Sequence, residues 1–264
     1  MKHLRTITAV LTILFFAVSC KKQSVDPAAT PVAATKKLQT LIWAAGYQSP
    51  QYFTYDTQGR LVKEDDNYQT EGYEYTGNTV HITDYNKSKA RIVSDITGTT
   101  DNAGRMISFT LNNTYTLNSP YTQQAVLTYD ANGYLTQIKF TRLYQGNTEI
   151  LTYDFTVIDG DYTKLLGTYI INGQFGSSFT EIFEYYTDKN DPTGIDTYPI
   201  VYETFGYNNG LFGKTNKHLI KHVQNGVVNP TWVMDYTYTL DSNGYPQTHN
   251  LTGTWNSSAT YSFQ

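Results

Sequence analysis

The chain has 264 residues, of which 39% are hydrophobic and only 16% are charged, and its formal net charge is −4. This length allows one sizeable core, and the content of 24 Tyr and 12 Phe favours strands over helices. The sequence has no basic block or stripe, which argues against nucleic acid as a partner. A single cysteine excludes an internal disulfide framework.

The first residues have the pattern of an export signal. Lys2 and Arg5 precede an apolar run over residues 7–18, which is too short for a helix that spans a membrane. We therefore expect residues 1–19 to be a signal peptide that is removed after export. The remaining chain then carries 17 basic and 23 acidic residues.

The apolar run ends in Leu-Phe-Phe-Ala-Val-Ser-Cys at residues 14–20. This stretch resembles the lipobox of bacterial lipoproteins, in which the Cys is acylated and becomes the first residue of the mature protein. Ala17 stands where Leu is most usual, and an ordinary cleaved signal with an incidental Cys is the alternative. The resemblance implies that Cys20 is lipidated and that acyl chains, at about 0.8 kcal/mol per buried CH₂, make the membrane a partner.

The stretch after Cys20 is predicted to be a tether. Its Ala, Thr and Pro have nothing to bury, so we expect residues 20–37 to be flexible and one domain to span residues 38–264. Lipoproteins with Asp just after the Cys tend to stay at the inner membrane, and Lys21 stands there instead. By that resemblance we expect anchoring in the outer membrane, with the domain on the periplasmic side rather than the cell surface.

Four Asp-to-Gly turns give the domain its most specific pattern. In each one, Asp can accept a backbone N–H two residues on, and Gly three residues after the Asp allows the left-handed backbone of a hairpin. The pairs of structural turn residues are Asp56 and Gly59, Asp101 and Gly104, Asp130 and Gly133, and Asp241 and Gly244.

Further turn pairs such as Asn172-Gly173 and Asn225-Gly226 separate short alternating segments. We therefore predict an all-β fold, an antiparallel up-and-down meander of about 12–16 strands. Because twist accumulates and long sheet edges are hazardous, the meander should form a strongly curved sheet or a barrel that is closed or partly open. In one strand, alternation predicts Ile138 and Phe140 on one face and Leu135, Gln137 and Lys139 on the other.

The corners at residues 55–61 and 129–135, each Tyr-Asp-x-x-Gly, resemble YD repeats of large bacterial wall-associated and shell-forming proteins. Together with the lipobox, residues 213–221 and residues 236–246, they resemble a family of Gram-negative cell-envelope lipoproteins of unknown function. That family has a barrel-like, so-called porin-like, β fold. The resemblance covers residues 38–264 and implies a fold and an envelope location, but no catalytic or binding residue.

One region, residues 186–217, breaks the rhythm of hairpins. Long irregular loops on a rigid sheet often carry binding sites. The region is interpreted either as such a loop or as a cap over one mouth of the barrel.

The sequence contains no nucleophile elbow, phosphate loop or zinc-protease motif. On a strand, His218 and His222 would lie about 13 Å apart, too far for one ion, so we expect exposed or capping histidines. Asp188 begins a stretch that resembles a calcium loop but lacks the later ligands. We expect no metal and no cofactor.

Acidic and aromatic residues are the remaining candidates for a site. Glu181 and Glu184 point to opposite faces of a strand, and Asp65 and Asp66 fit a solvated surface. Tyr side chains at a barrel mouth could stack on sugar rings. A packing role in the core or at the rim is predicted for Trp43, Trp232 and Trp255.

The sequence leaves three functional hypotheses. The first is a lipid-anchored, non-enzymatic β scaffold that binds a ligand such as a glycan, or an envelope protein. The second is a glycan-acting hydrolase whose carboxylates meet only in the fold. The third is an integral outer-membrane barrel, suggested by the aromatic content and by residues 261–263. Charged residues such as Lys139 and Asp154 argue against it, because their side chains would have to avoid the lipid.

Overall fold

The computed structural model describes residues 36–44, 50–114, 120–194 and 210–264. The predicted signal peptide, Cys20 and all but the last two residues of the tether lie outside this part of the chain. Within it, no helix is long and apolar enough to cross a membrane.

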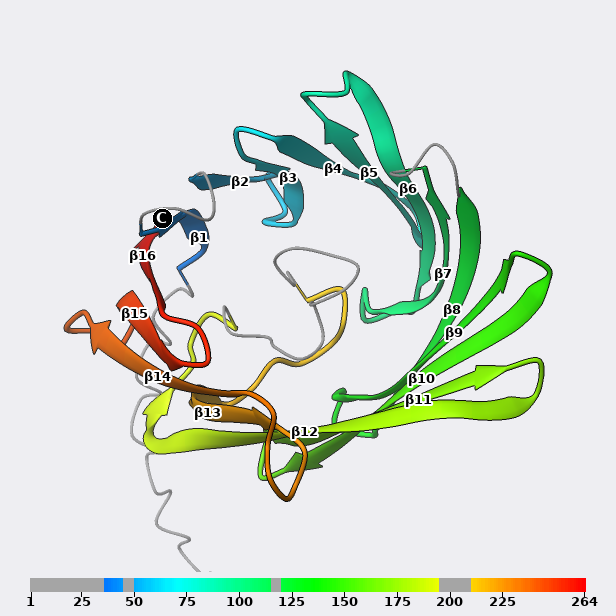
Figure 1. Cartoon of the computed structure of the whole chain (residues 1–264). Helices are drawn as coiled ribbons and strands as arrows, with labels where there is room; N and C mark the ends of the chain where they lie inside the picture. The colour runs from blue at the N-terminus through cyan, green and yellow to red at the C-terminus, as the bar shows by residue number, and fades with distance from the viewer. Residues whose placement is uncertain (1–35, 45–49, 115–119, 195–209) are drawn as a thin grey trace, which may run out of the picture. The chain divides into compact units, whose positions relative to one another are not determined.

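The described chain forms sixteen strands that follow one another in a meander (Figure 1). Each strand pairs antiparallel with its sequence neighbours, and β1 also pairs with β16, so the sheet closes into a barrel. The all-β prediction is confirmed, with a strand number at the upper end of the expected range. The strands are β1 (Leu38–Trp43), β2 (Gln51–Tyr55), β3 (Leu61–Asp65), β4 (Gln69–Thr76), β5 (Thr79–Asn86), β6 (Arg91–Thr100), β7 (Met106–Asn113), β8 (Tyr121–Tyr129), β9 (Leu135–Tyr144), β10 (Asn147–Ile158), β11 (Asp161–Ile171), β12 (Gln174–Asn190), β13 (His218–Asn225), β14 (Val233–Leu240), β15 (Pro246–Gly253) and β16 (Ser257–Phe263).

The two faces of the wall differ in polarity. Along β8, Ala125 and Leu127 are buried, whereas Gln124, Val126 and Thr128 between and beside them are exposed. The buried side chains of successive strands belong to one hydrophobic cluster inside the barrel. The wall of these strands is therefore apolar towards the interior and mostly polar towards the outside, as the period of two requires.

Small residues in the wall make room for pairs of aromatic rings. Gly167 lies in register between Tyr153 and Phe179, whose ring centroids are 6.0 Å apart. A Cβ at position 167 would collide with the Phe179 ring, so only Gly allows the ring to lie across the strand. The same arrangement recurs at Ala125, between Phe109 and Phe140, and at Ala259, between Trp43 and His249.

In a meander, alternate turns lie at opposite ends. We call the end with the β2–β3, β6–β7, β8–β9, β10–β11 and β14–β15 turns the corner rim. The end with the β3–β4, β5–β6, β9–β10, β11–β12 and β13–β14 turns is the distal rim. All four Asp-to-Gly turns lie at the corner rim.

The β8–β9 turn shows how a corner is built. Asp130 Oδ1 accepts hydrogen bonds from the backbone N–H groups of Asn132 at 2.9 Å and Tyr134 at 2.8 Å. Gly133 adopts a φ of 91°. The same two side-chain bonds form at the other three corners, from Asp56, Asp101 and Asp241.

Each corner also contains a bulge, which corrects one prediction. Tyr129 pairs with Leu135 but Thr128 pairs with Gln137, so Thr136 is an extra residue. The extra residue reverses the alternation, and Leu135 is fully buried on the same face as Ile138. The prediction that Leu135 opposes Ile138 was wrong for this reason.

Residues 210–217, which precede β13, lie along the corner rim. Met106 N donates to Leu211 O at 2.7 Å, Lys214 N to Gly133 O at 3.0 Å, and Lys217 N to Gly160 O at 3.0 Å. These bonds fasten residues 210–217 to three corners in turn. Residues 195–209, on which the cap interpretation also depends, lie outside the described residues. Strand β12 continues to Asn190, so the irregular region starts later than the predicted residue 186.

Candidate functional site

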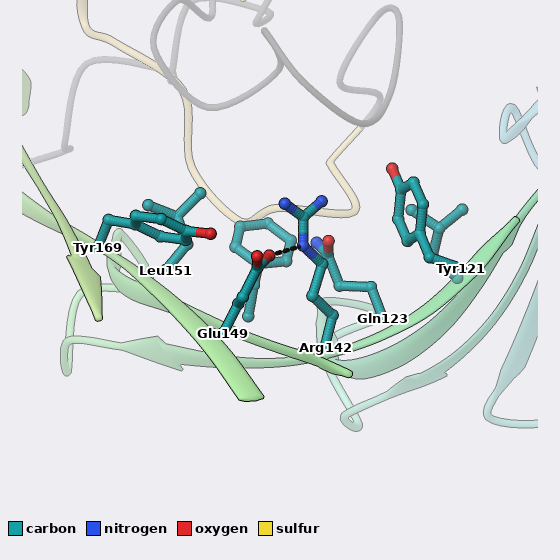
Figure 2. A pocket seen from close by; sticks show the side chains of 8 residues that line it. Tyr121, Gln123, Arg142, Glu149, Leu151 and Tyr169 are labelled. Atoms are coloured by element: carbon teal, nitrogen blue, oxygen red, sulfur yellow. Dashed lines mark hydrogen bonds and ion pairs between the residues drawn. The ribbon is translucent and has the colours of Figure 1, made fainter. Parts of the chain in front are cut away.

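A cavity of about 280 Å³ lies on the interior face of the barrel wall, towards the distal rim. Figure 2 shows its side chains projecting from the same face of neighbouring strands. The lining comes from β7 to β11 and consists of Leu111, Tyr121, Gln123, Phe140, Arg142, Glu149, Leu151 and Tyr169.

The polar groups of the cavity come from three adjacent strands at one level of the barrel. Gln123 on β8 pairs with Arg142 on β9, which in turn pairs with Glu149 on β10. Phe140 and Leu151 lie two residues further from the distal rim on the same two strands. They are cross-strand partners and form an apolar floor. The site therefore has a polar row above an apolar base.

Arg142 and Glu149 form an ion pair in which Arg142 Nε donates to Glu149 Oε2 (Figure 2). Burial alone would raise the pKa of Glu149, but hydrogen bonds from Tyr169 and Arg142 and the guanidinium charge outweigh it and lower the pKa. Burial alone would lower the pKa of Arg142, and Glu149 and Tyr169 raise it instead. Both groups are charged at neutral pH, and the pair is neutral as a whole.

Aromatic rings hold the guanidinium in place. Its central carbon lies 5.2 Å from the ring centroid of Tyr121 and 5.2 Å from that of Tyr144. Figure 2 shows the two terminal nitrogens of Arg142 directed into the cavity, away from Glu149. The site thus offers donors on Arg142, an acceptor on Glu149 and an amide on Gln123 to a molecule in the cavity.

The residues predicted from sequence lie elsewhere. The turn residues, such as Asp130 and Gly133, are at the corner rim and bind backbone groups of their own corners. Cys20 lies outside the described residues. In the part of the chain that the structure describes, no group of three or more His, Cys, Asp or Glu side chains could hold a metal ion.

The two histidines of β13 have separate partners. His218 is buried, not exposed as expected, because its Nδ1 lies 2.7 Å from Asp161 Oδ2 and its backbone N–H donates to Asp161 Oδ1 at 2.9 Å. His222 Nδ1 lies 2.7 Å from Asp235 Oδ1. Of the two alternatives predicted for His218, exposed or capping, exposure was wrong, since a carboxylate on β11 compensates its burial.

The predicted acidic residues do not form a site with the cavity. Burial alone would raise the pKa of Asp65, but hydrogen bonds from Lys87, Thr70 and Lys63 lower it to about 2. Asp66 accepts backbone N–H groups in the β3–β4 turn. Glu184 is exposed on β12.

The three tryptophans lie against other rings. Trp43 meets His249 at 5.3 Å between ring centroids inside the barrel. The ring centroids of Trp232 and Trp255 lie 5.8 Å apart near the distal rim, and Trp255 is 54% exposed.

The sequence reasoning missed Arg142 and Glu149, although one signal points to them. Both side chains lie on the interior face of their strands, because Arg142 comes two residues after Phe140 and Glu149 two residues before Leu151. A charged residue on the apolar phase is unusual unless it is paired. Two such residues of opposite sign, flanking the same hairpin turn, would have suggested an interior ion pair.

Comparisons with known proteins show the fold. No protein-family model matches the sequence, and no curated protein matches it. The chain is similar in structure to a porin-like protein from Bacteroides uniformis ATCC 8492, with a TM-score of 0.61, 17% identity, and coverage of 87% of this chain and 97% of that one. It is also similar to a porin-like protein from Bacteroides vulgatus ATCC 8482, with a TM-score of 0.63, 14% identity, and coverage of 87% and 99%. The chain therefore has a porin-like barrel fold.

Proposed function

We propose that the protein is an exported lipoprotein, anchored to the outer membrane through Cys20, whose barrel binds a small ligand in its interior without transforming it. The observation that carries the proposal is the polarity of the wall. A barrel embedded in a membrane turns an apolar band outwards and a polar lumen inwards. Here Gln124, Thr128 and Lys139 are exposed on the outside, while Leu127 and Phe140 are buried inside.

The same observation weighs against an integral outer-membrane barrel, although the fold is porin-like. Large apolar side chains on the outer face of β8 and β9, such as Val126 and Leu143, stand between polar neighbours rather than forming a continuous band. Export through the predicted signal and the likeness to porin-like proteins of Bacteroides both support an envelope location. The periplasmic side is proposed from the residues after Cys20.

The cavity supports binding rather than hydrolysis. Glycoside hydrolysis uses two carboxyl groups about 5 to 10 Å apart. Among the described residues that line the cavity, Glu149 is the one carboxylate, and it is paired with Arg142. A carboxylate held by a guanidinium is a weak acid–base catalyst but a good hydrogen-bond acceptor.

The described chain begins at the corner rim. Lys36 N donates to the Tyr245 hydroxyl at 3.0 Å, and Lys36 Nζ binds Asp241 at 2.9 Å. The cavity lies towards the distal rim.

Fractionation of cells that make the full chain tests the anchor. The native chain is expected in the membrane pellet, released by detergent and not by alkaline carbonate. The matched variant exchanges residues 1–19 for a leader cleaved by the general signal peptidase and carries Cys20→Ala. We expect this variant in the soluble fraction, and its retention in carbonate-washed membranes would contradict the proposal.

A further inference from the structure

We infer that the ligand of the interior cavity is a neutral sugar residue, held through adjacent hydroxyl groups by Arg142, Glu149 and Gln123. This inference rests on the proposed function and adds the chemical class of the ligand. Its basis is the pairing of opposite charges at one level of the wall.

The charge of the site excludes a simple ionic ligand. Arg142 and Glu149 face each other across β9 and β10, and Glu149 is only 8% exposed. An anionic ligand on Arg142 would lie beside this buried carboxylate, and a cationic ligand on Glu149 would lie beside the guanidinium. Either arrangement sets the charge of the ligand beside a like charge of the site, which costs free energy.

Adjacent hydroxyl groups avoid this conflict because each one both donates and accepts. One hydroxyl can accept from a terminal nitrogen of Arg142 while the next donates to Glu149 Oε. Gln123, in register on the other side of Arg142, offers an amide that can bind a third group. Three polar residues on three neighbouring strands therefore match a row of ring hydroxyls.

The rest of the lining fits the apolar face of a sugar ring. Phe140 and Leu151 form the floor, and the rings of Tyr121 and Tyr169 flank the polar row (Figure 2). Aromatic side chains combine a flat apolar face with a polar edge, as Tyr does here. The volume of about 280 Å³ lies just below the range of small-molecule pockets, about 300 to 1,000 Å³, and suits a single or terminal sugar residue.

The test measures binding of a defined panel to the purified full-length lipoprotein in detergent by isothermal titration calorimetry. The neutral probes are the methyl pyranosides of glucose, galactose, mannose and N-acetylglucosamine, and the anionic probe is methyl glucuronide. We expect saturable binding of at least one neutral probe and binding of methyl glucuronide at least tenfold weaker. Arg142→Gln should weaken the neutral probe at least tenfold.

Glu149→Gln supplies a result that a purely structural role would not give. Without the carboxylate, the guanidinium is left to bind an anion. The ratio of the affinity for methyl glucuronide to the affinity for the neutral probe should therefore rise at least tenfold. Asp154→Asn is the matched control, because it makes the same change on the outer phase of the same strand and should leave the preference unchanged. Near-ultraviolet circular dichroism confirms that each variant is folded.

Three outcomes would overturn the inference in different ways. Tighter binding of methyl glucuronide than of every neutral probe by the native protein would refute the sugar's neutrality while the proposed function stands. If no sugar binds, 1-anilinonaphthalene-8-sulfonate serves as a second probe. If this dye binds to the native protein and not to Arg142→Gln, the cavity binds ligands of another chemical class, and only the sugar inference is refuted. If none of the probes binds, the proposed ligand-binding function is refuted as well.

Discussion

The two rims of the barrel are built in different ways. At the corner rim, Asp side chains bind the turns, and residues 210–217 are fastened across three corners. At the distal rim, two-residue turns contain Gly146 and Gly173, and a Cβ added to either would meet nothing within 4 Å. The difference shows that residues 210–217 bind the β6–β7, β8–β9 and β10–β11 turns, whereas the β9–β10 and β11–β12 turns near the Arg142 cavity have open space around their glycines.

Tyr hydroxyl groups strengthen the corner rim further. Each of several tyrosines near the end of a strand donates to a backbone carbonyl of a neighbouring part of the wall. The bonds run from Tyr55 to Leu38 O at 2.7 Å, from Tyr75 to Leu61 O at 2.9 Å, from Tyr129 to Met106 O at 2.7 Å, and from Tyr185 to Tyr162 O at 2.7 Å.

The largest expected effect compares a glycine at each rim. Gly213 has a φ of 81°, and a Cβ there would collide with the carbonyl oxygen of Gly133, so both backbones would have to move. We expect Gly213→Ala to lower the free energy of unfolding by about 4 kcal/mol. Gly173 has a φ of 80° with free space around it, so Gly173→Ala should cost only about 1 kcal/mol. Urea unfolding followed by circular dichroism measures both, and equal losses would refute the difference between the rims.

A smaller effect on the free energy of unfolding is expected from two carboxyl groups, one near each rim, and it has opposite signs at the two. Asp84 on β5 has a buried Oδ1 that has no partner among the described residues. Burial, with the charge of Asp66, raises the pKa of Asp84 to about 6 from 3.8. The folded state therefore binds the proton first, and the ionised group destabilises the protein above pH 6. We expect Asp84→Asn to raise the free energy of unfolding by about 1 kcal/mol at pH 8.

Asp241 at the corner rim serves as the comparison. Hydrogen bonds from Lys36 and from the backbone of Tyr245 lower the pKa of Asp241 to about 2. Its stabilising contribution is present above pH 3.8 and is lost as the pH falls towards 2, so Asp241→Asn should destabilise at pH 8. At pH 4 the gain from Asp84→Asn should have disappeared while most of the loss from Asp241→Asn remains. Thermal unfolding at the two pH values checks both signs, and a gain from Asp84→Asn at pH 4 as large as at pH 8 would contradict the raised pKa.

The sequence predicted the strand type and the corners because both depend on local chemistry. Asp and Gly at fixed spacing define a turn wherever they occur, and alternation defines strands. The pairing of β1 with β16 could not be predicted from any local stretch of sequence, because it depends on how the twist adds up over sixteen strands. The inward position of Leu135 was missed because one bulged residue reverses the alternation.

The candidate site was hidden for a related reason. Arg142 and Glu149 are seven residues apart, and only the register of the β9–β10 hairpin makes them direct partners. Gln123 joins them through a second register, between β8 and β9. The burial of His218 was also hidden, because its partner Asp161 lies far away in sequence, on β11.

The most direct test of the central claim, that the outer face of the wall meets water, uses a single cysteine at its middle. Val126 is 58% exposed on the outer phase of β8, and Cys20 is the only cysteine of the native chain. Val126→Cys is treated with a membrane-impermeant maleimide in washed native membranes, with the parent chain as background. The account predicts labelling at the same rate before and after detergent is added. Labelling that appears only after detergent would show that lipid covers the wall and would contradict the account.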